Sequence, residues 1–261
     1  SRYLDPDGSF PNHIPNPENE TAMQSILDAV QESKADLGII FDTDVDRAGA
    51  VLSDGTELNR NRIIAMMAAI LLREHPGTTI VTDSITSTGL AAFIRKHGGV
   101  HHRFKRGYRN VINESMRLNR EGHDSQLAME TSGHGALKEN YFLDDGAYLV
   151  TRLLIELARA KKEGYTLESL IADLAEPAES KEFRMNILVP DFKAYGQKII
   201  DELNVSAASQ PGWSVAPDNF EGVRVNLDKA HGDGWFLLRL SLHDPLIPLN
   251  IESDSVGGVR Q

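Results

Sequence analysis

The sequence contains no cysteine among its 261 residues. Disulfide bonds, thiolate metal ligands and cysteine nucleophiles are therefore excluded, so any chemistry must use histidine and carboxylate groups. The absence also fits a reducing compartment, and we expect a cytoplasmic protein. A run of roughly 20 apolar residues, which a membrane-spanning helix needs, is missing as well. The sequence begins at Ser1 without an initiator methionine or a signal-peptide core, so we expect a piece of a longer protein.

Basic residues are in deficit, because 27 Lys and Arg stand against 38 Asp and Glu and give a formal net charge of −11. Such a field repels nucleic acid and anionic lipid, and we expect neither nucleic acid nor a membrane as a partner. A small anion can still bind where basic side chains and backbone N–H groups converge, because contact pairs outweigh a diffuse field that is screened within ~10 Å. The hydrophobic content of 41% is typical of a globular chain.

Helix and strand patterns alternate over the first two-thirds of the sequence. The stretch 2–17 is rich in Pro, Asn and Asp and is predicted to be a loop, after which Asn16 and Pro17 are predicted to start a helix. Apolar periodicity then predicts strands at 37–41, 80–81, 100–104 and 127–129 and helices at 63–72, 90–97, from about 110, and after Gly146. This alternation predicts an α/β fold with an open mixed sheet.

The pattern changes after residues 175–180, an Ala-, Glu- and Pro-rich stretch that we interpret as a linker. Beyond it the sequence predicts a strand at 183–189, a helix at 192–203 and strands at 223–227, 235–240 and 247–251. The order β-α-β-β-β predicts a small C-terminal α+β domain in which one helix covers an antiparallel sheet.

Three carboxylates, Asp42, Asp44 and Asp46, directly follow the first predicted strand. Carboxylates at alternate positions in a tight loop can turn their oxygens onto one hard cation such as Mg²⁺. An EF-hand is excluded because its sixth position needs glycine and here holds Arg47. The first motif of haloacid-dehalogenase-like phosphatases, an apolar strand followed by D-x-D-x-T/V, remains a rival, and so does a solvated acidic turn.

Two further segments gather polar groups around a glycine. Residues 130–134, Glu-Thr-Ser-Gly-His, offer a carboxylate, a hydroxyl and an imidazole, which suit the binding of sugar hydroxyls and the transfer of a proton. Residues 105–109, Lys-Arg-Gly-Tyr-Arg, form the densest basic cluster and lie on a predicted strand-to-helix turn, where free N–H groups favour anions. Taken singly, each segment fits a solvated polar turn equally well.

A last motif, Arg-Leu-Ser-Leu-His-Asp-Pro at 239–245, follows a predicted strand. Arg239 and Ser241 can both meet a phosphate, and the backbone N–H groups of the following turn can complete the site.

Residues 42–47, Asp-Thr-Asp-Val-Asp-Arg, resemble the metal loop of the α-D-phosphohexomutases, the phosphoglucomutase and phosphomannomutase family. The family form is D-G-D-x-D-R, and Thr43 replaces its glycine. The lead-in at 7–18 also looks like the family segment that precedes this loop.

Two other segments resemble family loops in the same order along the chain. Residues 130–134 resemble the sugar loop G-E-x-S-G-H, with Met129 at its first glycine. Residues 239–245 resemble the phosphate loop R-x-S-G-T/N-x-P, with Leu242 and His243 where glycine and a small polar residue are usual.

The resemblance implies a role for each residue of these loops. It implies that Mg²⁺ is held against a phosphoserine by Asp42, Asp44 and Asp46, and that Arg47 contacts the phosphate of that serine. It also implies sugar binding by Glu130 and Ser132, with His134 as a candidate general acid and base. Active-site roles for the remaining residues follow in the same way: Lys105 and Arg109 in the basic cluster, and Arg239, Ser241 and His243 on the substrate phosphate.

The resemblance also implies domains and an activity. It places the end of the second mutase domain at 1–58, the third at 59–178 and the fourth at 179–261. The implied partner is a phosphorylated hexose, and the implied enzyme moves phosphate between O6 and O1 of glucose or mannose through a bisphosphorylated intermediate.

One part of the family pattern has no counterpart in this sequence, namely the first domain with its serine in a T-A-S-H-N-P-like segment. We therefore expect the chain alone to be inactive and to need that N-terminal domain in cis. The alternatives left open are a haloacid-dehalogenase-like Mg²⁺-dependent phosphatase and a non-catalytic protein that only binds phosphosugar.

Overall fold

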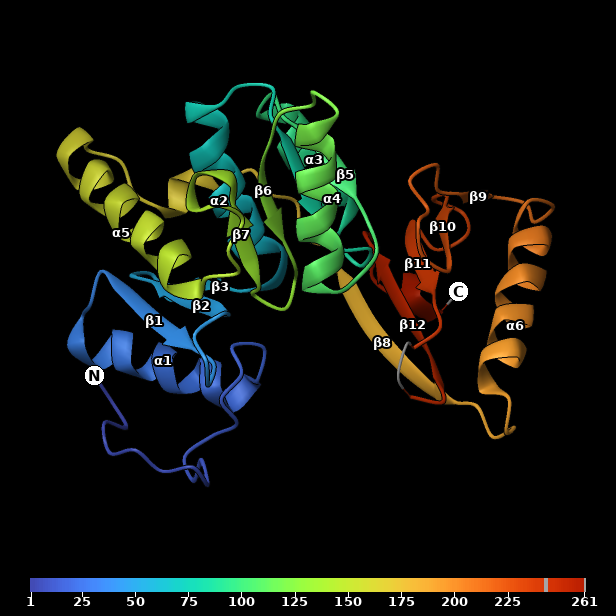
Figure 1. Cartoon of the computed structure of the whole chain (residues 1–261), viewed down its shortest axis with the longest axis horizontal. Helices are drawn as coiled ribbons and strands as arrows, with labels where there is room; N and C mark the ends of the chain where they lie inside the picture. The colour runs from blue at the N-terminus through green and yellow to red at the C-terminus, as the bar shows by residue number, and fades with distance from the viewer. Residues whose placement is uncertain (242–243, 261) are drawn as a thin grey trace.

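The computed structural model describes residues 1–241 and 244–260. Within this part the chain forms three sheets, and we name the segments that carry them the N-terminal unit (1–58), the middle unit (59–178) and the C-terminal unit (179–260). Figure 1 shows the first two units packed together, with the C-terminal sheet beside them and strand β8 starting at the junction. Among the described residues, no helix combines the length and the apolar content needed to cross a membrane.

The N-terminal unit is a helix on a small antiparallel sheet, and its elements are α1 (Glu20–Ser33), β1 (Leu37–Phe41), β2 (Ala48–Leu52) and β3 (Glu57–Leu58). Helix α1 begins later than predicted, because Asn19 caps it by accepting the N–H of Ala22 at 3.0 Å. Asn16 instead accepts the N–H of Glu18 in a local turn, at 2.9 Å. The predicted helix start at Asn16 is therefore wrong.

The middle unit confirms the predicted open mixed sheet. Its elements are α2 (Arg60–Glu74), β4 (Thr79–Thr82), α3 (Thr88–Lys96), β5 (Val100–Arg103), α4 (Tyr108–Arg120), β6 (Ser125–Met129), β7 (Gly135–Leu137) and α5 (Gly146–Glu163). The strand order is β5-β4-β6-β7, with β4 parallel to β5 and β6, and β7 antiparallel to β6. The carboxyl ends of β4, β5 and β6 therefore meet at one edge, where α/β folds place their ligands.

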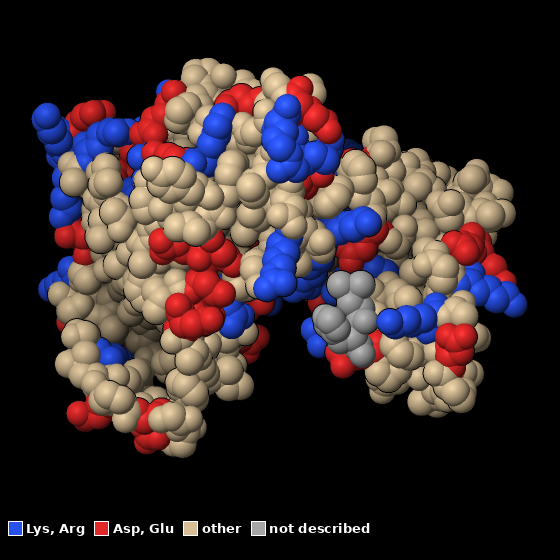
Figure 2. Space-filling view, in the orientation of Figure 1, with Lys and Arg blue, Asp and Glu red and all other residues tan. Residues whose placement is uncertain are grey.

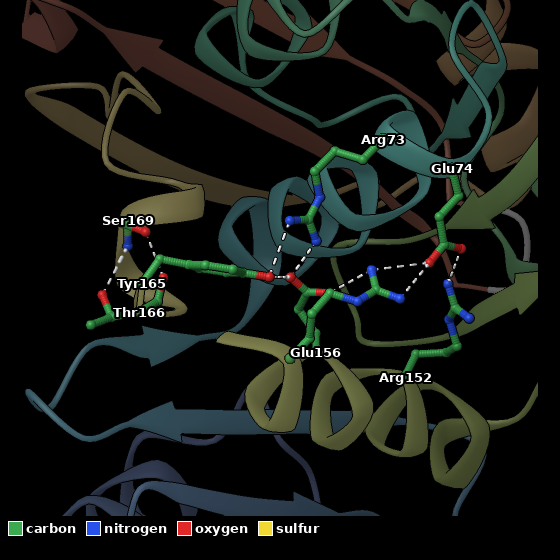
Figure 3. Close-up of polar contacts among 8 residues, drawn as sticks. Arg73, Glu74, Arg152, Glu156, Tyr165, Thr166 and Ser169 are labelled. Atoms are coloured by element: carbon green, nitrogen blue, oxygen red, sulfur yellow. Dashed lines mark hydrogen bonds and ion pairs between the residues drawn. The ribbon is translucent and has the colours of Figure 1, made fainter. Parts of the chain in front are cut away.

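Helix α2 lies at the centre of the largest apolar core, which it shares with β2, β3 and α5. On one side α2 and α5 are also joined by a polar network around the buried carboxylate of Glu156, shown in Figure 3. The N-terminal and middle units therefore share one core, and this holds the β1–β2 hairpin firmly against the middle sheet.

The C-terminal unit is an antiparallel sheet with one helix, as predicted. Its elements are β8 (Glu179–Asn186), α6 (Phe192–Ala207), β9 (Trp213–Val215), β10 (Val223–Leu227), β11 (Gly234–Leu238) and β12 (Leu246–Ser253), in the order β8-β12-β11-β10-β9. Strand β8 begins inside the predicted linker and ends three residues earlier than predicted. Helix α6 covers one face of the sheet in a separate apolar core. Single 3₁₀ turns lie at η1 (Lys138–Asn140), η2 (Glu168–Leu170) and η3 (Gly258–Arg260).

Candidate functional site

The three aspartates predicted to hold a metal lie in the loop that joins β1 to β2. One carboxylate oxygen from each of Asp42, Asp44 and Asp46 lies within 4.8 Å of the others, in a loop whose Val45 has a φ of 65°. Asp42 is buried, Asp46 is half-buried and Asp44 is exposed. Three hard oxygen donors at this spacing fit a divalent cation such as Mg²⁺.

The charges in this loop are closely coupled. Burial alone would raise the pKa of Asp42, but hydrogen bonds from Arg47 lower it below its ordinary value: Nε donates to Oδ2 at 2.7 Å and the backbone N–H to Oδ1 at 3.2 Å. Burial raises the pKa of Asp46 to about 6, and although His134 opposes this rise, the carboxylates of Asp42 and Asp144 add to it. Such crowding of carboxylates is what a bound cation would relieve.

The predicted sugar loop, residues 130–134, lies directly against the metal loop. Arg47 and His134 pair as an isolated antiparallel bridge, and the N–H of Ala48 donates to the carbonyl of Gly133 at 3.4 Å. Gly133 has a φ of 98°, and a Cβ there would lie 2.9 Å from the Ala48 carbonyl oxygen. Glycine is therefore needed at this position to let the two loops touch.

His134 is held in place by its neighbours. Its Nδ1 lies 2.8 Å from a carboxylate oxygen of Asp144 and 3.7 Å from one of Asp46, and the ring of Tyr108 stacks on the imidazole at 4.9 Å between centroids. Burial lowers the pKa of His134, but the bond to Asp144 and the nearby carboxylates outweigh it and raise this pKa above its ordinary value. An oriented imidazole whose protonated form is favoured by neighbouring carboxylates suits a general acid.

Glu130 is buried at the carboxyl end of β6. It accepts the N–H of Gly107 at 2.5 Å, and the hydroxyl of Ser132 donates to its other oxygen at 3.4 Å. Burial raises the pKa of Glu130 to about 7, and the charge of Asp83 adds to the rise. A carboxyl group that shares its proton near neutral pH can both accept and donate hydrogen bonds to sugar hydroxyls.

Asp83 was missed by sequence reasoning. It is fully buried just after β4, and it accepts the hydroxyl of Thr131 at 2.8 Å, which anchors the sugar loop to the neighbouring strand. Like Asp42 it stands directly after a strand, but it lacks the alternating carboxylates that singled out Asp42.

The basic cluster at 105–109 lies at the predicted strand-to-helix junction, on the turn after β5 and the first two residues of α4. Lys105 and Arg109 are exposed, and Arg109 lies over the ring of Tyr108 at 5.6 Å with its Nε donating to the hydroxyl at 3.0 Å. Arg106, to which we assigned no role, is half-buried and lines a cleft of about 510 Å³ between the middle unit and the C-terminal sheet.

The predicted phosphate loop begins directly after β11. Arg239 is partly buried, with Nη1 3.7 Å from an oxygen of Glu221, and Glu221 in turn accepts the N–H of Arg106 at 2.7 Å. The Ser241 hydroxyl accepts the N–H of Asp244 at 3.2 Å. His243 lies outside the described residues, so its predicted role stays a prediction.

These contacts form one continuous series along the carboxyl ends of the middle strands. The metal loop touches His134, the sugar loop touches the basic turn through Glu130, and the basic turn meets Arg239 through Glu221. Figure 2 shows the molecule hollowed between the C-terminal unit and the rest, with acidic and basic side chains beside the hollow. Clustered carboxylate oxygens spaced for a cation at one end and guanidinium groups at the other suit a doubly anionic ligand.

Comparison with known proteins gives a consistent result. Residues 1–55 match the family model for phosphoglucomutase/phosphomannomutase alpha/beta/alpha domain II, and residues 59–177 match the model for domain III. The phosphomannomutase/phosphoglucomutase of Pseudomonas putida is 33% identical over 255 residues, which cover 97% of this chain and 51% of that protein. The chain spans about half the length of the curated relatives it matches.

Solved structures agree with the sequence relatives. A phosphoglucomutase/phosphomannomutase family protein from Burkholderia thailandensis superposes with a TM-score of 0.79 at 30% identity, over 98% of this chain and 51% of that one. An N-acetylphosphoglucosamine mutase from Aspergillus fumigatus, solved in complex with GlcNAc-6P and magnesium, shares the fold with a TM-score of 0.56 at 14% identity, over 90% of this chain and 50% of that one. The two domain models together match most of the chain, and the chain therefore belongs to the phosphoglucomutase/phosphomannomutase family.

Proposed function

We propose that this chain is the part of a phosphohexomutase that binds Mg²⁺ and a phosphorylated hexose. In the whole enzyme it would serve the interconversion of hexose 6-phosphate and hexose 1-phosphate, with glucose or mannose as the sugar. The observation that carries this proposal is the direct contact between the metal loop and the sugar loop, through the bridge of Arg47 with His134.

The residues divide the work between two ends of the ligand. We propose that Asp42, Asp44 and Asp46 hold Mg²⁺, which supplies positive charge for a phosphoryl group in transfer. Arg47, whose Nε donates to Asp42, would bring its guanidinium to the same phosphate and stabilise the charge that develops there. His134, fixed by Asp144, would give a proton to the sugar oxygen that leaves the phosphate and take one from the oxygen that attacks.

The other end of the ligand would meet the middle and C-terminal units. Glu130 and Ser132 would bind sugar hydroxyls, and Arg239 and Ser241 would bind the phosphate that is not being transferred. Lys105 and Arg109 extend from the exposed side of the basic turn and would add positive charge at the entrance. We also propose that residues 179–261 are the fourth mutase domain.

Binding by the chain itself tests the proposal. We expect isothermal titration calorimetry to detect binding of glucose 1-phosphate to the chain. The variants Arg239→Ala and Glu130→Gln should each lower this affinity about tenfold or more. Mn²⁺ serves as a spectroscopic substitute for Mg²⁺. We expect electron paramagnetic resonance titrations to detect Mn²⁺ binding to the wild-type chain and no such binding to Asp42→Asn.

Matched controls for these variants are Arg120→Ala and Asp36→Asn, which change exposed residues of the same types outside the site. If the site variants bind sugar phosphate and cation as well as the controls do, the proposed assignments are wrong. If the longer protein that contains this chain naturally lacks the catalytic serine and still binds sugar phosphate, it is instead a non-catalytic phosphosugar-binding protein.

A further inference from the structure

The loop between β9 and β10, residues 216–222, docks onto the carboxyl ends of β4 and β5, and we call it the docking loop. Asp218 forms an ion pair with the buried guanidinium of Arg103. The ring of Phe220 packs against Phe104 at 5.1 Å and against His102 at 5.4 Å between centroids. These contacts join the C-terminal unit to the edge of the middle sheet.

Glu221 brings this loop into the candidate site. One carboxylate oxygen accepts both the hydroxyl of Ser84 and the backbone N–H of Arg106, each at 2.7 Å. Its other oxygen lies 3.7 Å from Nη1 of Arg239. A single half-buried carboxylate therefore links two strand ends of the middle unit to the arginine of the phosphate loop.

The distances show that Glu221 attracts the guanidinium of Arg239 without accepting a hydrogen bond from it. At 3.7 Å the pair is an electrostatic contact and is too long for a hydrogen bond. Among the residues that the structure describes, the buried Nε of Arg239 also has no partner. The guanidinium of Arg239 thus keeps its N–H groups for another acceptor in the same place.

Glu221 also offsets a repulsion. Burial lowers the pKa of Arg239, Arg106 lowers it further, and the carboxylate of Glu221 opposes both effects. Without Glu221, the positive charge of Arg106 would act on the guanidinium of Arg239 with less compensation. The carboxylate of Glu221 therefore favours a charged Arg239 in this half-buried place.

We propose that Glu221 is a positioning residue, which fixes the C-terminal unit on the middle unit and so aims Arg239 at the substrate phosphate. The inference rests on the proposed function, in which Arg239 binds that phosphate. Hydrogen bonds from Ser84 and Arg106 set the position of the unit, and the carboxylate charge sets the direction of the guanidinium.

The test measures the distance between units and the affinity for ligand separately. Because the chain has no cysteine, Asn113→Cys on α4 and Val205→Cys on α6 give two exposed labelling sites without background. We expect Glu221→Ala to lengthen the mean distance between the two labels, or to broaden the distribution of distances, in the absence of ligand. We expect the same change to weaken glucose 1-phosphate binding about tenfold.

Two further variants separate positioning from general damage. Glu221→Gln keeps an oxygen for both donors, so we expect the distance between labels to stay as in the wild type. An increase in this distance as large as that in Glu221→Ala would contradict the role of the two hydrogen bonds. In an Arg239→Ala background, Glu221→Ala should weaken binding little further, whereas full additivity would contradict the positioning role. Glu202→Ala, an exposed change on α6, is the matched control.

The outcomes also separate this inference from the proposed function. If the wild-type chain binds no glucose 1-phosphate but Glu221→Ala still opens the units, the proposed function fails while the docking role of Glu221 is supported. If the wild type binds ligand and Glu221→Ala changes neither distance nor affinity, or makes binding tighter, the inference is overturned.

Discussion

Glu252 lies on the face of the C-terminal sheet that turns toward the middle unit, at the wall of the 510 Å³ cleft. Its carboxylate accepts the indole N–H of Trp235 at 2.9 Å, and the guanidinium of Arg224 lies over the ring of Trp235 at 3.5 Å. Burial raises the pKa of Glu252 to about 7, although the indole and Arg224 both oppose the rise. This single residue therefore makes the stability of the unit depend on pH.

The sign follows from proton binding. The folded state binds the Glu252 proton more tightly than the unfolded chain, whose carboxyl titrates near 4.5, so the contribution to stability is full below pH 4.5 and is lost as the pH rises through about 7. We expect the unfolding free energy of the wild type to fall relative to that of Glu252→Gln over this window, by at most about 3 kcal/mol.

Fluorescence can follow this effect because both tryptophans, Trp213 and Trp235, lie in the C-terminal unit. Urea unfolding at a series of pH values gives the difference between variant and wild type, which removes the contribution of other titrating groups. Glu202→Gln, on the exposed side of α6, should follow the wild type at every pH. Parallel curves for Glu252→Gln and wild type would show that Glu252 titrates normally.

At the scale of elements, α2 and α5 are joined by a polar network around one buried carboxylate as well as by their apolar core. Figure 3 shows Glu156 between Arg73 and Tyr165, and the hydroxyl of Tyr165 donates to it at 2.5 Å while Arg73 forms an ion pair with it. Arg159, one turn further along α5, donates to its other oxygen at 3.3 Å. Removing the carboxylate would leave several donors without their acceptor.

We expect Glu156→Ala to destabilise the middle unit by about 2 kcal/mol or more, and Glu156→Gln, which keeps an acceptor, by about 1 kcal/mol. Amide hydrogen exchange along α2 and α5 measures this change where tryptophan fluorescence would not. Glu163→Gln, at the exposed end of α5, should leave exchange unchanged. Equal protection in Glu156→Ala and wild type would mean that apolar packing alone holds the two helices.

The same elements show what the sequence can predict. Helix α5 carries apolar residues at helical spacing and α2 carries an apolar run of helical length, so their existence was predictable although their ends were not. Strand β2, Ala-Gly-Ala-Val-Leu, has little β-propensity, and β7 and β9 are three residues long. Each of these strands forms by pairing with a strand adjacent to it in sequence, and the periodicity of a single segment does not report such pairing.

At the scale of the whole molecule, the loops of the candidate site were predictable and their supports were not. Asp42 and Glu130 stand directly after apolar strands, so local sequence places them at a strand end. Asp144 orients His134 from ten residues further along the chain, and Glu221 reaches the site from another unit, 115 residues from Arg106. Only the tertiary arrangement reveals such partners.

The last prediction concerns the whole molecule, because the chain spans about half the length of its curated relatives. The mutase mechanism that we propose needs a covalently held phosphate opposite the metal loop, and no serine of this chain stands in the family's T-A-S-H-N-P-like context. A phosphate donor that must diffuse in loses the large effective concentration of a tethered one. We therefore expect the chain alone to convert no glucose 1-phosphate to glucose 6-phosphate.

A coupled assay with glucose 6-phosphate dehydrogenase measures this conversion, with catalytic glucose 1,6-bisphosphate present and the Pseudomonas putida relative as the positive control. Turnover by the isolated chain above its Asp42→Asn variant would contradict the need for a separate phosphoserine. Release of inorganic phosphate that requires Asp42 and Asp44 would favour the dehalogenase-like alternative instead, because there an aspartate of the loop attacks the phosphate itself. Absence of both activities, together with retained binding of glucose 1-phosphate, is the result that a substrate-binding half of a mutase should give.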